Sequence, residues 1–120
     1  MSVELWGLKN CDACKKALKW LEAESLEHKF HDLRKDPPNG ERLAHWLEAL
    51  GSDKLLNRRG TTWRKLEADQ QALAETEAGA LSLITEHDAL MKRPIWEVSG
   101  QVTVGFAKTD LENLQALLKG

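Results

Sequence analysis

The sequence predicts a single α/β domain in which helices pack against a mixed β-sheet. Three observations support this fold class: a strand–helix–strand pattern in the first third, a helical middle, and two strands followed by a helix at the end. At 120 residues the chain has the usual length of one domain and can bury a core of its own.

The first third is predicted to form a β–α–β unit. Val3–Trp6 is a short β-prone run, and the loop after it leads to Cys11. From Asp12 onward apolar residues recur at spacings of three and four, which predicts a helix that ends at Ser25. His28–Leu33 follows as a second strand, and a crossover of this kind makes the two strands parallel neighbours.

The middle of the chain is predicted to be helical. After the turn-forming sequence DPPNG, Leu43–Leu50 has an apolar stripe at helical spacing. Thr61 or Thr62 is expected to cap a second helix, because threonine oxygens accept hydrogen bonds from free N–H groups. Leu73–Leu90 is expected to contain one or two more helices, with Gly79 as the break.

The end of the chain is predicted to form a β-hairpin and a helix. Ile95–Val98 and Gln101–Phe106 flank Ser99–Gly100, a two-residue turn in which glycine can adopt a positive φ. Thr109–Glu112 matches a capping box that starts the last helix. The apolar face of this helix consists of Leu111, Leu114, Leu117 and Leu118.

A β–α–β unit followed by a β–β–α unit in one mixed four-stranded sheet is the arrangement of the thioredoxin-like fold. We therefore predict a thioredoxin-like core formed by residues 1–35 and 91–120, with a helical insertion at residues 36–90. The two parts together are expected to form one domain that spans residues 1–120.

The composition argues against nucleic-acid and membrane binding. Lys and Arg total 17 and Asp and Glu total 19, so the net charge of −2 provides no overall basic surface for nucleic acid or an anionic bilayer. No apolar run approaches the roughly 20 residues that cross a bilayer. Charged residues also interrupt the N-terminal stretch, unlike a secretory signal. We therefore expect a cytoplasmic protein, in which a close cysteine pair is typical of redox chemistry or metal binding.

The two cysteines of the chain, Cys11 and Cys14, lie at the predicted start of the first helix. Free N–H groups and the helix dipole stabilise a negative sulfur at this position, and Lys9 adds positive charge, although Asp12 opposes it. Cys14 lies nearly one helical turn further on, within reach of a disulfide with Cys11. We predict that Cys11 is the accessible nucleophile and Cys14 its more buried partner.

Two other interpretations of the cysteine pair are core packing and zinc binding. Packing suits Cys14, which shares a helix face with Leu21, but it suits Cys11 poorly because a loop–helix junction is usually accessible. A structural zinc site needs two further ligands, and the four histidines show no zinc-finger spacing. Redox chemistry is therefore favoured, and no metal site is predicted.

Five sequence blocks, WGLKNCDACKKALKWL, HDLRKD, LLNRRGTTWRKL, MKRPI and VGF, occur in the order and spacing found in arsenate-reductase-like proteins. Over essentially its whole length the chain resembles this ArsC family, and most of all the YffB-like members of its bacterial Spx/MgsR-type branch. The resemblance implies a thioredoxin-like fold with a helical insertion and a catalytic cysteine at Cys11. It also implies that Pro94 is cis and presents Arg93 towards the sulfur.

The function that this resemblance implies is glutathione-dependent thiol–disulfide reduction through Cys11, with glutathione as co-substrate and glutaredoxin as a candidate partner. Lys9 and Arg93 beside a thiolate suit a tripeptide that carries carboxylates. The residues expected to bind substrate are Lys9, Asn10, Arg58, Arg93 and Pro94.

Two alternative functions stay open. An Spx-like regulator would use the cysteine pair as a redox switch and bind the α subunit of RNA polymerase. An arsenate reductase would need a cluster of arginines for the oxyanion. Arg93 matches one of these arginines. Asn57 stands at the position of the second arginine, directly before Arg58 and Arg59. The position of the third arginine falls near Gly105.

Overall fold

The structure, a computed structural model, describes residues 3–119. Contacts divide the chain into two compact units: Met1–Pro37 with Arg93–Gly120, called the sheet unit below, and Pro38–Lys92, called the helical unit. The interpretation of the helical unit as an insertion at residues 36–90 of a single domain stays a prediction.

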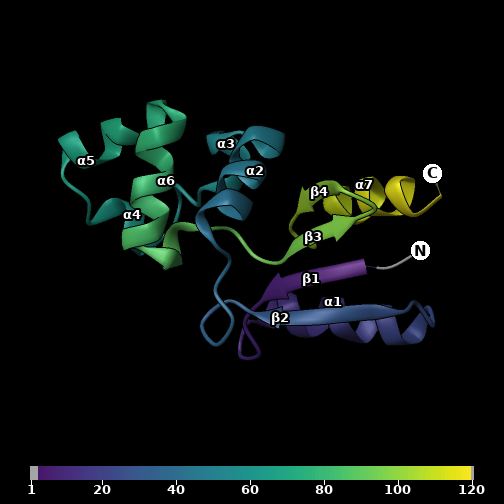
Figure 1. The fold of residues 1–120 in the computed structure, drawn as a ribbon. Helices are drawn as coiled ribbons and strands as arrows, with labels where there is room; N and C mark the ends of the chain where they lie inside the picture. Colours follow the sequence, from purple (N-terminus) through teal and green to yellow (C-terminus); the bar gives the residue numbers. More distant parts are fainter. Residues whose placement is uncertain (1–2, 120) are drawn as a thin grey trace. The chain divides into compact units, whose positions relative to one another are not determined.

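The sheet unit has the predicted β–α–β and β–β–α order (Figure 1). Its elements are β1 (Val3–Gly7), α1 (Asp12–Ala23), β2 (His28–Asp32), β3 (Ile95–Val98), β4 (Gln101–Val104) and α7 (Lys108–Lys119). The strand order is β2-β1-β3-β4, in which β1 and β2 are parallel and the other neighbouring pairs are antiparallel. The α/β class and the mixed four-stranded sheet of a thioredoxin-like fold are therefore confirmed.

One face of the sheet packs against α1 and α7. The buried side chains of this core are Val3, Leu5, Ala17, Leu21, Trp96, Val98 and Leu114. Trp96 contacts Trp20 and Phe106, with ring centroids 6.2 and 6.0 Å away, and its Nε1–H donates to the Gly105 carbonyl at 2.9 Å. The other leucines of α7 pack against the same core, so the apolar face predicted for this helix is confirmed.

The opposite face of β1 and β2 carries a polar network around His31. Side chains alternate along a strand, so Trp6 points away from the core that Leu5 enters. The Trp6 ring stacks on the His31 imidazole with centroids 4.0 Å apart. The two ring nitrogens of His31 lie 2.8 Å from a Glu4 oxygen and 3.2 Å from an Asp36 oxygen. This network connects the segment after β2 to the sheet.

The hairpin and the last helix differ in detail from the prediction. Ser99 and Gly100 form the expected two-residue turn, with φ of +50° and +83°. β4 ends at Val104 rather than at Phe106, because Gly105 turns the chain with φ +94°. The capping box predicted for Thr109–Glu112 is wrong: α7 already begins at Lys108, and Asp110 accepts a hydrogen bond from the Ala107 N–H at 3.0 Å.

The helical unit contains short helices around α2 and α6. Its elements are α2 (Gly40–Leu50), α3 (Ser52–Leu55), α4 (Thr61–Arg64), α5 (Ala68–Ala72), η1 (Leu73–Glu75), α6 (Glu77–Glu86) and η2 (Asp88–Leu90). The predicted stripe at Leu43–Leu50 lies within α2, where Leu43, Trp46 and Leu47 are buried. Between residues 3 and 119 no helix has both the length and the apolar character to span a bilayer.

Two predictions for helix ends in this unit are wrong. Gly79 is not a break: it lies buried in the first turn of α6, where a Cβ would collide with the Leu73 carbonyl. The break falls at Thr76, whose hydroxyl accepts a hydrogen bond from the Gly79 N–H at 3.0 Å. The N-cap of α4 is Gly60, so Thr61 is the first helical residue and its side chain makes no capping bond.

Candidate active site

The loop between β1 and α1 places Cys11 at the start of α1. Cys11 is the N-cap residue, with an extended backbone at φ −88° and ψ 126°. Its N–H donates to the Leu8 carbonyl at 3.2 Å, and its own carbonyl accepts from the Lys15 N–H at 2.9 Å. The side chain is partly exposed. The predicted position of Cys11 at an accessible helix N-terminus is therefore confirmed.

The surroundings of Cys11 favour its thiolate. Partial burial opposes the charged form, but the N–H and thiol of Cys14, the N–H of Ala13 and the Arg93 side chain all interact with the sulfur. Together these donors outweigh the burial and lower the pKa of the Cys11 thiol. The site therefore provides a nucleophilic sulfur nearer to neutral pH than an ordinary cysteine would.

Cys14 differs from Cys11 in both its burial and the direction of its pKa shift. Its side chain is fully buried, and this burial raises the pKa of the Cys14 thiol to about 11, although the Leu8 N–H partly offsets the effect. Gly7 allows this packing, because a Cβ at Gly7 would overlap the Cys14 sulfur. Cys14 therefore stays protonated and can donate its S–H to the Cys11 thiolate.

Arg93 and Pro94 approach the site from the strand next to β1. Arg93 is half-buried two residues before β3, and β3 pairs with β1 through Trp6 and Ile95. The Arg93–Pro94 peptide bond is cis, as the family resemblance implied. The structure thus brings Cys11, Cys14 and Arg93 together, and substrate binding by Arg93 and Pro94 stays a prediction.

Lys9 and Asn10 are exposed in the loop that precedes Cys11. At the end of β2, hydrogen bonds from the N–H groups of Arg34 and Lys35 lower the pKa of the Asp32 carboxyl, and the charges of Lys35 and Lys9 make smaller contributions in the same direction. Binding of substrate by Lys9 and Asn10 is not tested by this geometry and stays a prediction.

Arg58 belongs to the helical unit. Its guanidinium pairs with Asp53 at 3.1 Å and lies 5.2 Å from the centre of the Trp63 ring. Asn57 accepts a hydrogen bond from the Arg59 N–H at 3.1 Å, which is the behaviour of a turn-forming residue. Binding of substrate by Arg58 stays a prediction.

Sequence reasoning missed the contributions of Gly7 and Leu8. Gly7 provides the space for the Cys14 sulfur, and the Leu8 N–H interacts with that sulfur. A glycine at the end of a strand was the available signal, because it often marks a close approach to the backbone. No sequence pattern marks the Leu8 N–H as a donor to the Cys14 sulfur, because every residue except proline has an N–H group.

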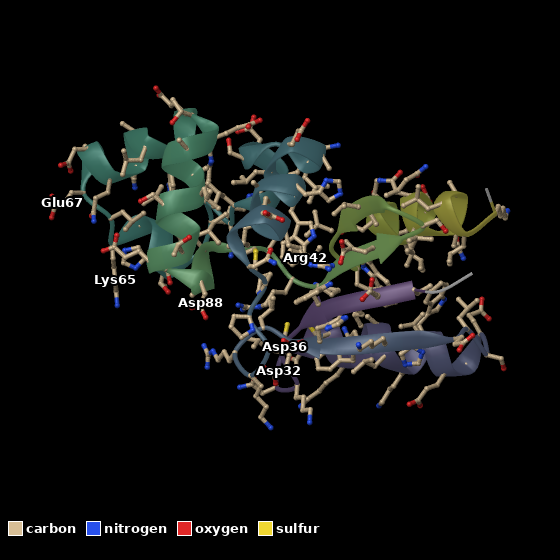
Figure 2. The ribbon with its side chains drawn as sticks, in the orientation of Figure 1. Asp32, Asp36, Arg42, Lys65, Glu67 and Asp88 are labelled. Atoms are coloured by element: carbon tan, nitrogen blue, oxygen red, sulfur yellow. The ribbon has the colours of Figure 1, made fainter. Side chains whose placement is uncertain are left out.

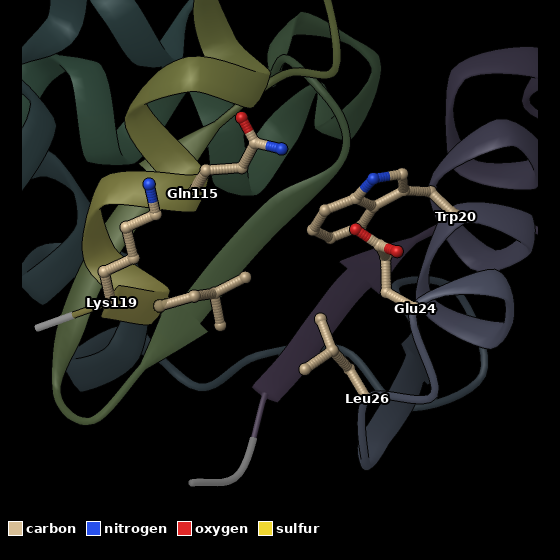
Figure 3. Close-up of a pocket in the computed structure, with 6 residues that line it drawn as sticks. Trp20, Glu24, Leu26, Gln115 and Lys119 are labelled. Carbon is tan, nitrogen blue, oxygen red and sulfur yellow. The ribbon is translucent and has the colours of Figure 1, made fainter.

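A separate pocket lies at the other end of α1. It has a volume of about 340 Å³ and is lined by Trp20, Glu24, Leu26, Gln115, Leu118 and Lys119 (Figure 3). Its residues lie in the second halves of α1 and α7 and in the segment that follows α1, so the pocket is distinct from the cysteine site at the start of α1. Within the described part of the chain, no group of three or more His, Cys, Asp or Glu side chains is arranged to hold a metal ion.

Comparison with known proteins places the chain among arsenate-reductase-like proteins. A model of the ArsC family matches residues 6–114. An uncharacterised protein of Haemophilus influenzae is 39% identical over 110 residues, which cover 92% of this chain and 96% of that protein. A solved structure of a YffB protein is 36% identical with a TM-score of 0.83, and the match covers 96% of this chain and 98% of the other.

A regulator is also among the relatives. The global transcriptional regulator Spx of Streptococcus pneumoniae is 27% identical over 104 residues, which cover 85% of this chain and 77% of that protein.

The family model includes the positions of Cys11, Cys14 and Arg93 and extends over most of the sequence. The chain therefore belongs to the ArsC family.

Proposed function

We propose that the protein is a cytoplasmic thiol–disulfide oxidoreductase that uses glutathione and acts through Cys11. The observation that supports this function most directly is the contrast between the two thiols. Cys11 is partly exposed at the start of α1 and its pKa is lowered, whereas Cys14 is buried and its pKa is raised. Disulfide exchange requires an accessible thiolate of this kind, and a second thiol beside it can release the product.

In the first step the Cys11 thiolate attacks one sulfur of a substrate disulfide. A bond forms between Cys11 Sγ and that sulfur, and the substrate S–S bond breaks. The electron pair of the broken bond leaves on the second substrate sulfur as a thiolate, which takes a proton from water. The Cys14 thiol and the Arg93 side chain stabilise the Cys11 thiolate before the attack.

In the second step another thiol attacks Cys11 Sγ and releases the rest of the substrate. If Cys14 attacks, its proton passes to the departing substrate sulfur, a Cys11–Cys14 disulfide forms, and two glutathione thiols reduce it. If glutathione attacks, Cys11 becomes glutathionylated, and a second glutathione or a glutaredoxin restores the thiol. Both routes oxidise two glutathione thiols to one glutathione disulfide and reduce one substrate disulfide to two thiols.

Binding of glutathione is assigned to the residues around the sulfur. Glutathione carries two carboxylates, for which Lys9 and Arg93 supply cations beside Cys11. Asn10 precedes the nucleophile in the same loop, and Pro94 begins the chain segment that leads into β3. A reduced glutathione pool is a property of the cytoplasm, which is therefore the compartment that this activity needs.

Alkylation of Cys11 tests the lowered pKa. Only the thiolate reacts with iodoacetamide, so the rate rises with pH, and a lowered pKa moves this rise to lower pH. We expect the half-maximal rate below about pH 8.5, the ordinary value for cysteine. Arg93→Met should move the profile to higher pH because a group that stabilises the sulfur is lost. Tandem mass spectrometry locates the label and also detects the glutathione adduct that oxidised glutathione should form on Cys11.

Arg64→Met provides the control for this measurement, because it removes a guanidinium from the exposed surface of the helical unit. Its alkylation profile should match that of the unmodified protein. A half-maximal rate at the ordinary cysteine value, together with no adduct from oxidised glutathione, would contradict the proposed function.

An Spx-like regulator is the second candidate, supported by the similarity to Spx and by the spacing of Cys11 and Cys14. A regulator of this type would bind the C-terminal domain of the RNA polymerase α subunit and use the cysteine pair as its switch. Under the enzymatic proposal we expect no binding to this domain in either redox state. A pull-down with reduced and oxidised protein measures this, with Cys14→Ser as the variant that cannot form the disulfide. Capture in one redox state only would favour the regulator.

Arsenate is not the substrate that we propose. An arsenate site needs several arginines, and Gly105 stands near the third expected position. The φ of Gly105 is +94°, and Asp110 occupies the space that a side chain there would need. An arginine at Gly105 would therefore have a strained backbone and would have to displace the Asp110 carboxylate.

A further inference from the structure

Two loops bring basic side chains to the edge of the sheet where β1 and β2 end. Lys9 follows β1 and Lys35 follows β2, and both are exposed. β1 and β2 are parallel, and their last register pair is Gly7 with Asp32, so the loops that carry Lys9 and Lys35 leave the sheet at the same edge. The two lysines thus belong to neighbouring loops, although they are 26 positions apart in the sequence.

Backbone contacts hold the second loop against the loop that carries Cys11. The Leu33 N–H donates to the Gly7 carbonyl at 2.9 Å, immediately after the last register pair, Gly7 with Asp32. Asp32 Oδ1 accepts from the N–H groups of Arg34 and Lys35 at 2.9 and 3.2 Å. Figure 2 shows Asp32 and Asp36 together at this end of β2. Lys35 is thus anchored through its own backbone near the start of the Cys11 loop.

The charge at this edge is opposite in sign to that of the whole molecule. The charged residues of the two loops, the end of β2, the first turns of α1 and the Arg93–Pro94 segment before β3 are Lys9, Asp12, Lys15, Lys16, Asp32, Arg34, Lys35, Asp36 and Arg93. Six of them are basic and three are acidic, whereas the net charge of the whole chain is −2. Of the acidic ones, Asp36 is also bonded to His31 and Asp32 to backbone N–H groups.

We propose that this site selects disulfides that carry carboxylates beside the sulfur, and that Lys35 is a specificity-determining residue for them. The inference rests on the proposed disulfide exchange at Cys11. The anionic substrate is attracted to Lys9, Lys35 and Arg93, while the chemical step is the same attack of the Cys11 thiolate that a neutral disulfide undergoes. The preference therefore affects which disulfide reaches the sulfur and leaves the exchange chemistry itself unchanged.

Two small disulfides separate recognition from chemistry. Dithiodipropionate has a carboxylate on each arm, and bis(2-hydroxyethyl) disulfide is neutral and of similar size. The measured quantity is the ratio of their second-order rate constants with Cys11, the anionic over the neutral. We expect this ratio to exceed one at about 0.01 M salt, where charges act over about 30 Å, and to fall at about 0.15 M, where they act over about 8 Å.

Two variants are expected to move this ratio in opposite directions. Lys35→Glu reverses one charge and should lower the ratio by about three- to fivefold at low salt. Asp32→Asn removes a negative charge but keeps an oxygen that can accept the backbone N–H groups, so the ratio should rise by about twofold. Lys19→Glu is the matched control, because it makes the same charge change at an exposed site in the second half of α1.

The outcomes distinguish this inference from the proposed function. A fall with Lys35→Glu that Lys19→Glu does not reproduce supports the specificity role, and a rise with Asp32→Asn strengthens it. Equal effects of Lys35→Glu and Lys19→Glu, or a ratio insensitive to salt, overturn the specificity role while the exchange activity stands. No reaction of Cys11 with either disulfide overturns the exchange activity and the specificity role together.

Discussion

Cys11→Ser is expected to abolish disulfide exchange, with a loss of about 1,000-fold or more in rate. A serine hydroxyl is almost fully protonated near neutral pH, so this site would hold no anionic nucleophile. Cys14 cannot replace Cys11, because its thiol is buried and its pKa is raised to about 11. The rate is measured as the consumption of bis(2-hydroxyethyl) disulfide in the presence of reduced glutathione.

Cys14→Ser is the matched control for this prediction. Serine is close to cysteine in size and its hydroxyl can still donate a hydrogen bond to Cys11, so the first step should survive. We expect one equivalent of thiol to be released per protein molecule and a stable mixed disulfide to remain on Cys11 when glutathione is absent. Retention of more than about a tenth of the exchange rate in Cys11→Ser would exclude Cys11 as the nucleophile.

Trp96→Ala is expected to reduce the free energy of unfolding by about 3–5 kcal/mol. Trp96 is fully buried in the core of the sheet unit, where its ring contacts Trp20 and Phe106. Alanine would leave a large cavity and would remove the donor to the Gly105 carbonyl. Denaturant titration followed by circular dichroism measures the change, which is large against the 5–15 kcal/mol typical of a domain.

Trp96→Phe separates the two contributions to this loss. Phenylalanine keeps an aromatic ring in the core but has no N–H for the Gly105 carbonyl, so we expect a smaller loss of about 1–2 kcal/mol. If Trp96→Ala and Trp96→Phe lowered the unfolding free energy equally, the hydrogen bond rather than the packing of the ring would account for the effect.

The fold was predictable wherever one physical signal dominated. Apolar spacing identified α1, α2 and α7, and the order of strand and helix patterns led to the mixed sheet. The errors concern the ends of helices and the end of β4, where one local hydrogen bond or one glycine decides the outcome. Thr76 caps α6, and Asp110 accepts a hydrogen bond from the Ala107 N–H near the start of α7. Other threonines in the chain have the same intrinsic capping ability, so the sequence does not show which one is used. Gly79 resembled a break because its tight packing against Leu73 is invisible in the sequence.

The site was predictable to the extent that it depends on neighbours in sequence. The position of Cys11 at a helix start follows from the strand and helix patterns on either side. Arg93 is 82 positions away and came only from the family resemblance, because pairing of β1 with β3 brings it to the sulfur. Lys35 was not identified, because the predicted parallel pairing of β1 and β2 left open the register that brings Gly7 opposite Asp32 and sets the two loops at one edge.

The contact between Gly7 and Cys14 restricts the substitutions that this sequence can accept during evolution. The two residues share one small volume, so an added methyl group at residue 7 would have to displace the thiol. Mutations at these positions are therefore coupled, and the combined effect of two changes should differ from the sum of the separate effects. Residue 7 gains freedom to vary only when the side chain at residue 14 becomes smaller.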